Sequence, residues 1–101
     1  MKNWHTESTD RLIRALTSVK NSEECYELLE DLCTIREIID MSQRLEVALL
    51  LSQDKKYQEI AKETGASTAT ISRVKKCLSY GSGGYISALE NLKNSEEQDE
   101  F

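Results

Sequence analysis

One stretch of the chain decides the fold, residues 57–79, which read YQEIAKETGASTATISRVKKCLS. Its apolar residues recur at helical spacing on both sides of Gly65. Glycine adopts a positive φ without steric cost, so Gly65 suits a tight turn between two short helices. We therefore expect one helix over Tyr57 to Thr64 and a second from about Thr68 to Ser79.

The apolar and small residues of this stretch stand where a helix-turn-helix needs them. Ile60 and Ile71 are the apolar contacts expected between the two helices. Ala61 is small where the second helix crosses close to the first. Gly65 occupies the turn, and Val74 continues the buried face begun by Ile71. The alternative, a plain helical hairpin with a solvated polar face, predicts each of these features singly but not their coincidence.

The other face of the second helix carries no acidic residue, and either Ser67 or Thr68 can cap its start. Short side chains allow close approach to base edges, and cations suit guanine or phosphate. We expect contacts close to the bases of double-stranded DNA from Thr68, Ala69, Ser72 and Arg73. Phosphate contacts are expected from Lys55, Lys56, Lys75 and Lys76, although the first two lysines are equally well explained as solvated charges.

Two side chains at the ends of the motif, Tyr57 and Tyr80, are expected to pack against the protein rather than stack on bases. Cys77 is expected to pack near the end of the second helix. The three cysteines of the chain are an odd number without metal-ligand spacing, so we expect reduced thiols, mostly in the core.

Charge is distributed unevenly along the chain. The formal net charge is −5, yet residues 53–78 carry 6 basic and 3 acidic residues, a balance of +3. Residues 1–52 (6 basic, 10 acidic) and 79–101 (1 basic, 5 acidic) each balance to −4. The basic window favours a DNA-binding regulator, because neutralisation of phosphates supplies most non-specific affinity. The acidic flanks support a different hypothesis, a protein-interaction adaptor without specific DNA readout.

A length of 101 residues is sufficient for one domain, which we expect over residues 1–93, followed by an acidic, flexible tail at 94–101. No apolar segment approaches the ~18 residues of a membrane span, and no secretory signal is evident, so a soluble cytoplasmic protein is expected. His5 is the only histidine. A nucleophile, base and orienting group cannot be assembled around it, so we expect neither an enzyme nor a metal or cofactor site.

The rest of the chain also predicts helices, because it has no proline and no glycine other than Gly65 before position 81. Asn21-Ser22 separates two apolar stripes, and Thr34 with Glu37 matches a capping box that opens a third helix. The uninterrupted apolar run Val47 to Leu51 should lie at the centre of the fold. After the glycines at 81–84, a last helix is expected from Tyr85 to about Lys93. The prediction is an all-α fold of about six helices.

The chain resembles the Trp-repressor-like helix-turn-helix proteins, and within them the YerC/YecD type. The resemblance rests on DLCTIREI, MSQRLEVALLL and YQEIAKETGASTATISRVKKCLSYGSGGY, and covers about residues 22–93. It implies an intertwined homodimer that offers one recognition helix per subunit to successive major grooves, and a bacterial-type transcriptional regulator, in particular a repressor.

The resemblance also raises the question of a small-molecule effector. In the tryptophan-binding members, an arginine of the central helix and one of the recognition helix flank the indole, and a glycine leaves room for it. Arg73 and Thr70 match pocket positions, but Gln43 stands at the central arginine, with Arg44 one residue away, and Val74 replaces the glycine. Gln43, Arg44, Thr70 and Arg73 are thus the effector-pocket candidates. Tryptophan itself is not expected to bind, because the isopropyl group of Val74 would fill the space of the indole.

Overall fold

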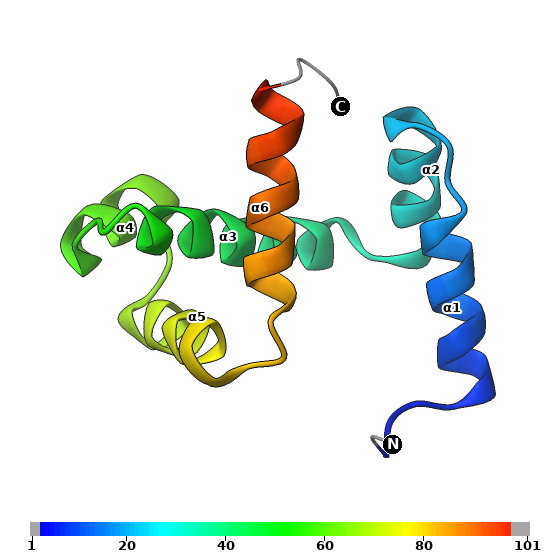
Figure 1. The fold of residues 1–101 in the computed structure, drawn as a ribbon, viewed down its shortest axis with the longest axis horizontal. Coiled ribbons are helices and arrows are strands. Elements are labelled where there is room, and N and C mark those ends of the chain that lie inside the picture. Colours follow the sequence, from blue (N-terminus) through cyan, green and yellow to red (C-terminus); the bar gives the residue numbers. More distant parts are fainter. Residues whose placement is uncertain (1–2, 98–101) are drawn as a thin grey trace. The chain divides into compact units, whose positions relative to one another are not determined.

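Six helices make up the computed structural model, which describes residues 3–97 and has no strand among them (Figure 1). They are α1 (Glu7–Thr17), α2 (Ser22–Leu32), α3 (Ile35–Ser52), α4 (Tyr57–Thr64), α5 (Thr68–Tyr80) and α6 (Gly84–Glu97). The all-α fold predicted from the sequence is therefore confirmed. Over the same residues, no helix combines the length and hydropathy that crossing a membrane requires.

The chain forms two compact units, the first ending at Ile35 and the second beginning at Arg36. The first unit contains α1 and α2, and the second contains α4, α5, α6 and all of α3 after its first residue. The expectation of a single domain over residues 1–93 stays a prediction.

In the first unit, polar side chains define where the helices begin. The backbone N–H of Thr6 donates to Thr9 Oγ1 at 2.7 Å and the N–H of Thr9 donates to Thr6 Oγ1 at 3.2 Å, a reciprocal cap for α1. The Glu24 N–H donates to Asn21 Oδ1 at 2.9 Å, so α2 begins at the break predicted from Asn21-Ser22.

The apolar stripes of the first unit are incompletely covered. Neither α1 nor α2 contains a buried residue. Leu12, Ile13 and Leu32 are 40%, 49% and 51% exposed. Cys25 and Cys33 are free thiols that are half-buried rather than core residues. These helices present an apolar surface that the unit itself does not bury.

The core belongs to the second unit, where it joins four helices. Its buried residues come from α3, α4, α5 and the turn between the last two: Val47, Ala48, Leu50, Ile60, Ala66, Ile71 and Val74. Leu51, Tyr57, Ala61, Leu78, Tyr85 and Leu89 pack against them. Three residues of the apolar run in α3 are thus buried, which confirms that this run lies at the centre of its unit.

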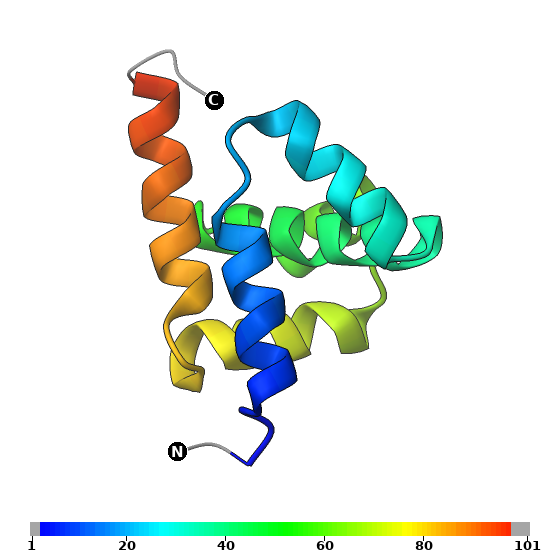
Figure 2. The same ribbon diagram turned by 90° about the vertical axis from the view of Figure 1, so that its right-hand side faces the viewer.

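The last helix, α6, runs across the directions of α3 and α5 in two views (Figures 1 and 2). It continues to Glu97, four residues beyond the end predicted at Lys93. No glycine or proline lies between these positions, and helix elongation is favourable once a helix has nucleated. The first part of the predicted tail, 94–97, is therefore helical, and the remainder lies outside the described residues.

Candidate nucleic-acid interface

A glycine turn joins α4 to α5. Gly65 has φ 74° and ψ 6°, the left-handed conformation, and its N–H donates to the carbonyl oxygen of Ala61 at 2.9 Å. The Thr64 hydroxyl donates to the Ile60 carbonyl at 2.7 Å and accepts from the Ala66 N–H at 3.1 Å. Both sides of the turn are thus hydrogen-bonded to the end of α4.

A serine hydroxyl begins the second helix of the motif. Ser67 Oγ accepts from the Thr70 backbone N–H at 3.1 Å, so Ser67, and not Thr68, is the N-cap of α5. The local hydrogen bonds of the turn and the cap fix the start of α5, with three residues between the end of α4 and the first residue of α5. The two helices and the turn form a helix-turn-helix.

One side of α5 packs into the core. Ile71 and Val74 are buried at 0% and 1% exposure, against Ile60 of α4, which is also fully buried. Ala61 is half-buried and packs on the same cluster. Four of the five residues predicted for the interior of the motif therefore lie in or against the core cluster, and the fifth, Gly65, forms the turn.

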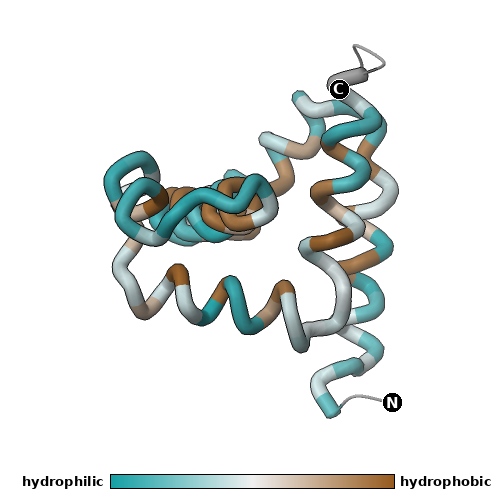
Figure 3. Tube along the Cα trace, turned by 60° about the vertical axis from the view of Figure 1, so that its left-hand side comes forward, coloured by the Kyte–Doolittle hydropathy of each residue, from teal (hydrophilic) through white to brown (hydrophobic). Residues whose placement is uncertain are grey.

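The opposite side of α5 is solvent-exposed. Successive helical residues are about 100° apart, so Ala69, Ser72 and Lys76 form a stripe roughly opposite Ile71 and Val74. All three are exposed, as are Thr68 and Arg73 on the two sides of the stripe. Hydrophobic and hydrophilic stretches alternate along α5 in Figure 3. The base-proximal candidates thus share one accessible face with Lys76, which we assigned to phosphate.

Electrostatically, this face is basic, and its cations form no ion pair with another described residue. No acidic residue occurs between Gly65 and Tyr80. The ion pairs found among the described residues join Glu7 to Arg11 and Arg36 to Asp40, and so do not involve α5. Cations on an exposed helix face, without an ion-pair partner among the described residues, suit contacts to phosphates and base edges.

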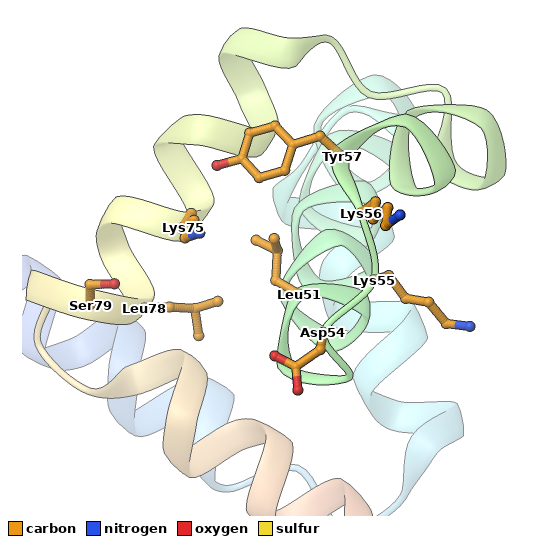
Figure 4. A pocket seen from close by; sticks show the side chains of 8 residues that line it. All are labelled: Leu51, Asp54, Lys55, Lys56, Tyr57, Lys75, Leu78 and Ser79. Carbon is orange, nitrogen blue, oxygen red and sulfur yellow. The ribbon is translucent and has the colours of Figure 1, made fainter.

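A pocket of about 460 Å³ separates the C-terminal half of α5 from the link between α3 and α4 (Figure 4). It is lined by Leu51, Asp54, Lys55, Lys56, Tyr57, Lys75, Leu78 and Ser79. Lys75 Nζ lies 5.7 Å from the centroid of the Tyr57 ring, a cation–π contact that holds this lysine at the edge of α5. Lys55 and Lys56 are exposed and point away from Lys75 (Figure 4).

The effector-pocket candidates differ in burial and in hydrogen-bond partners. Gln43 is half-buried, and its Nε2 donates to the Thr64 carbonyl at 3.1 Å. Thr70 is half-buried beside the Ser67 cap, with which its hydroxyl shares a 3.1 Å hydrogen bond. Arg44 is half-buried and Arg73 exposed. Gln43 therefore serves the turn of the motif, a role that its candidacy for an effector pocket did not anticipate.

The sequence carried a signal for this role of Gln43. Gln43, Val47 and Leu50 are spaced i, i+4 and i+7, so a polar side chain stands on the buried stripe of α3. Such a group needs a hydrogen-bond partner inside the fold. The spacing indicates that need, although it does not name Thr64 as the partner.

Two residues of α5 differ from expectation. Tyr80 is 86% exposed and does not pack, whereas Tyr57 is half-buried against the core as expected. Cys77 is exposed, so its predicted packing is wrong. Leu78 takes the inward position on this part of α5. Around the helix axis, Cys77 lies about 100° from Leu78 and Tyr80 about 160° from Leu78, so both side chains point away from the core.

These features define the class of the protein: an all-α helix-turn-helix protein with a basic second motif helix. Comparison with known families is more specific. Residues 7–93 match the Trp repressor protein family, and the chain belongs to that family.

Individual relatives agree with this assignment. The chain is 52% identical over 89 residues to the uncharacterized protein YerC of Bacillus subtilis strain 168, covering 88% of this chain and 86% of YerC. Among solved structures, a TrpR-like protein from Eubacterium eligens is 48% identical, with a TM-score of 0.84 over 87% of this chain and 91% of that one. A candidate Trp repressor from Staphylococcus aureus is 44% identical, with a TM-score of 0.85 over 88% and 89% of the two chains. The predicted resemblance is thereby confirmed.

Proposed function

We propose that this protein is a sequence-specific regulator of transcription that binds double-stranded DNA through α5. The observation that carries the proposal is the exposed face of α5, which is free of acids and carries, beside short side chains, cations that form no ion pair with any described residue. Its opposite face is anchored by the fully buried Ile71. Family membership supports the same function, and the names of the family and of the solved relatives favour a repressor.

In this proposal the residues of α5 divide into two roles. The base-proximal residues are Thr68, Ala69, Ser72 and Arg73, where small side chains allow the helix to approach the major groove and Arg73 suits guanine. Lys75 and Lys76, with Lys55 and Lys56 at the entry of α4, neutralise phosphates.

The uncovered apolar stripes of α1 and α2 favour a homodimer. Side chains such as Ile13 and Leu32 are about half exposed within their unit, and a second copy of the chain would cover them. A dimer also supplies two recognition helices, which bind half-sites about one helical turn (~34 Å) apart. Sedimentation or light scattering should therefore give twice the mass of the chain.

The experiment that tests the function is selection of bound fragments from a genomic DNA library, followed by titration of the enriched site. A regulator enriches a two-fold symmetric sequence. With four phosphate contacts per subunit, log K should fall with log salt at a slope of about −7. The adaptor hypothesis predicts no enriched sequence and little salt dependence, and that result would overturn the proposal. Repeating the selection with small metabolites shows whether an effector exists.

A further inference from the structure

The side chain of Gln43 connects the central helix to the motif. Its neighbours on the same stripe of α3, Val47 and Leu50, are buried, and Gln43 itself is half-buried. Its Nε2 donates to the carbonyl oxygen of Thr64 at 3.1 Å, across 21 residues of sequence. The hydrogen bond thus joins α3 to the last residue of α4.

The acceptor is a carbonyl that α4 cannot satisfy internally. The last four C=O groups of a helix have no partner within it, and Thr64 is the final residue of α4. The next residue, Gly65, reverses the chain with φ 74°. The same Nε2 atom lies 4.0 Å from the position that a Cβ of Gly65 would take. The amide therefore lies directly against the turn.

The turn determines where α5 begins and where it points. Three residues separate Thr64 from the first residue of α5, and all three are constrained: by the φ of Gly65, by burial of Ala66 and by the cap of Ser67. A contact that holds the Thr64 carbonyl against α3 consequently holds the start of the recognition helix as well.

We propose that Gln43 is a positioning residue for the recognition helix. Its amide holds the turn of the motif on α3 and thereby sets where α5 begins and how α5 is presented to DNA. Nε2 donates to a protein acceptor, so this hydrogen bond directly connects α3 to the motif. The consequence for DNA readout rests on the proposed function, whereas the restraint on the turn does not.

The experiment compares Gln43→Leu, which keeps the approximate size of the side chain but has no donor, with the exposed control Gln53→Leu. Amide exchange of Gly65 and Ala66 is measured by NMR in the full chain without DNA. We expect exchange in Gln43→Leu to be about 5-fold faster or more, because the Thr64 carbonyl loses its partner. The control should leave it unchanged.

Binding is then titrated on the selected duplex and on a random duplex. We expect Gln43→Leu to lose about 3- to 30-fold on the selected site and much less on the random one, with the salt slope unchanged because no phosphate contact is removed. If Gln43→Leu does not fold, Gln43→Glu, which replaces the amide donor with an acceptor, takes its place in both measurements.

Unchanged exchange at Gly65 and Ala66 in a folded variant would overturn the proposal. So would wild-type affinity and specificity on the selected duplex. If the wild-type protein binds no duplex, the proposed DNA-binding function fails, and the exchange measurement still decides whether Gln43 restrains the turn.

Discussion

Substitution of Gly65 by alanine isolates the backbone of the motif turn. Gly65 has φ 74°, and the nearest heavy atom to an added Cβ is Gln43 Nε2 at 4.0 Å, an ordinary van der Waals contact. The extra methyl group therefore fits without displacing a neighbour. Any loss of stability must come from holding an L-residue in the left-handed conformation.

Two opposing contributions set the expected magnitude for Gly65→Ala. The left-handed conformation costs an L-residue about 1–2 kcal/mol. Alanine also restricts the unfolded chain, which favours folding by about 0.4–1 kcal/mol. The free energy of unfolding should consequently fall by about 1 kcal/mol, or about 4–8 °C in Tm for a domain of this size. Gly65→Asn should lose less, since asparagine occupies this region more readily.

Urea unfolding followed by far-ultraviolet circular dichroism measures this difference. All variants are compared at one protein concentration, because the stability of an oligomer depends on it. We expect a lower midpoint with an unchanged m value for Gly65→Ala. Equal stability of Gly65→Ala and wild type, or equal losses for Gly65→Ala and Gly65→Asn, would refute the assignment of the cost to backbone conformation.

Three further predictions concern α5 and its end. Gly81→Ala should reduce stability by about 1–3 kcal/mol in the same unfolding assay, because the added Cβ would collide with the backbone carbonyl of Cys77. The control Gly84→Ala has no neighbour within 4 Å and should change stability by less than about 0.5 kcal/mol; equal effects of the two substitutions would contradict the steric explanation. Arg73→Ala should lower affinity for the selected duplex by about 1–3 kcal/mol and relax its sequence preference, so that equal losses on selected and random duplexes would argue against a base contact. Lys76→Ala should weaken binding to all sequences alike and reduce the magnitude of the salt slope by about 2, because the homodimer loses one phosphate contact per subunit, and a selective loss on the selected duplex would move Lys76 to the base-reading group.

The motif could be predicted because its determinants are local. Gly65 and Ser67 specify the turn and the cap through their own backbone and side chain, and the predicted bounds of α4 and α5 agree with the structure to within one residue. The end of α6 could not be predicted as well, since no residue between Lys93 and Glu97 breaks a helix. When no local residue breaks a helix, its end depends on contacts with the rest of the molecule, which the local sequence does not specify.

By itself, the sequence determined the all-α class, the helix-turn-helix and the acid-free face of its second helix, because helical periodicity, capping and charge are properties of neighbouring residues. The family was indicated separately, by the resemblance of three sequence motifs to known proteins. The tertiary structure alone decided the partner of Gln43 and the contact between Lys75 and Tyr57, which join residues 21 and 18 positions apart. It also decided the exposure of Cys77 and Tyr80. A periodic pattern says which side of a helix is apolar, but only the packing of α3, α4, α5 and α6 determines how much of each side is covered and which polar groups meet.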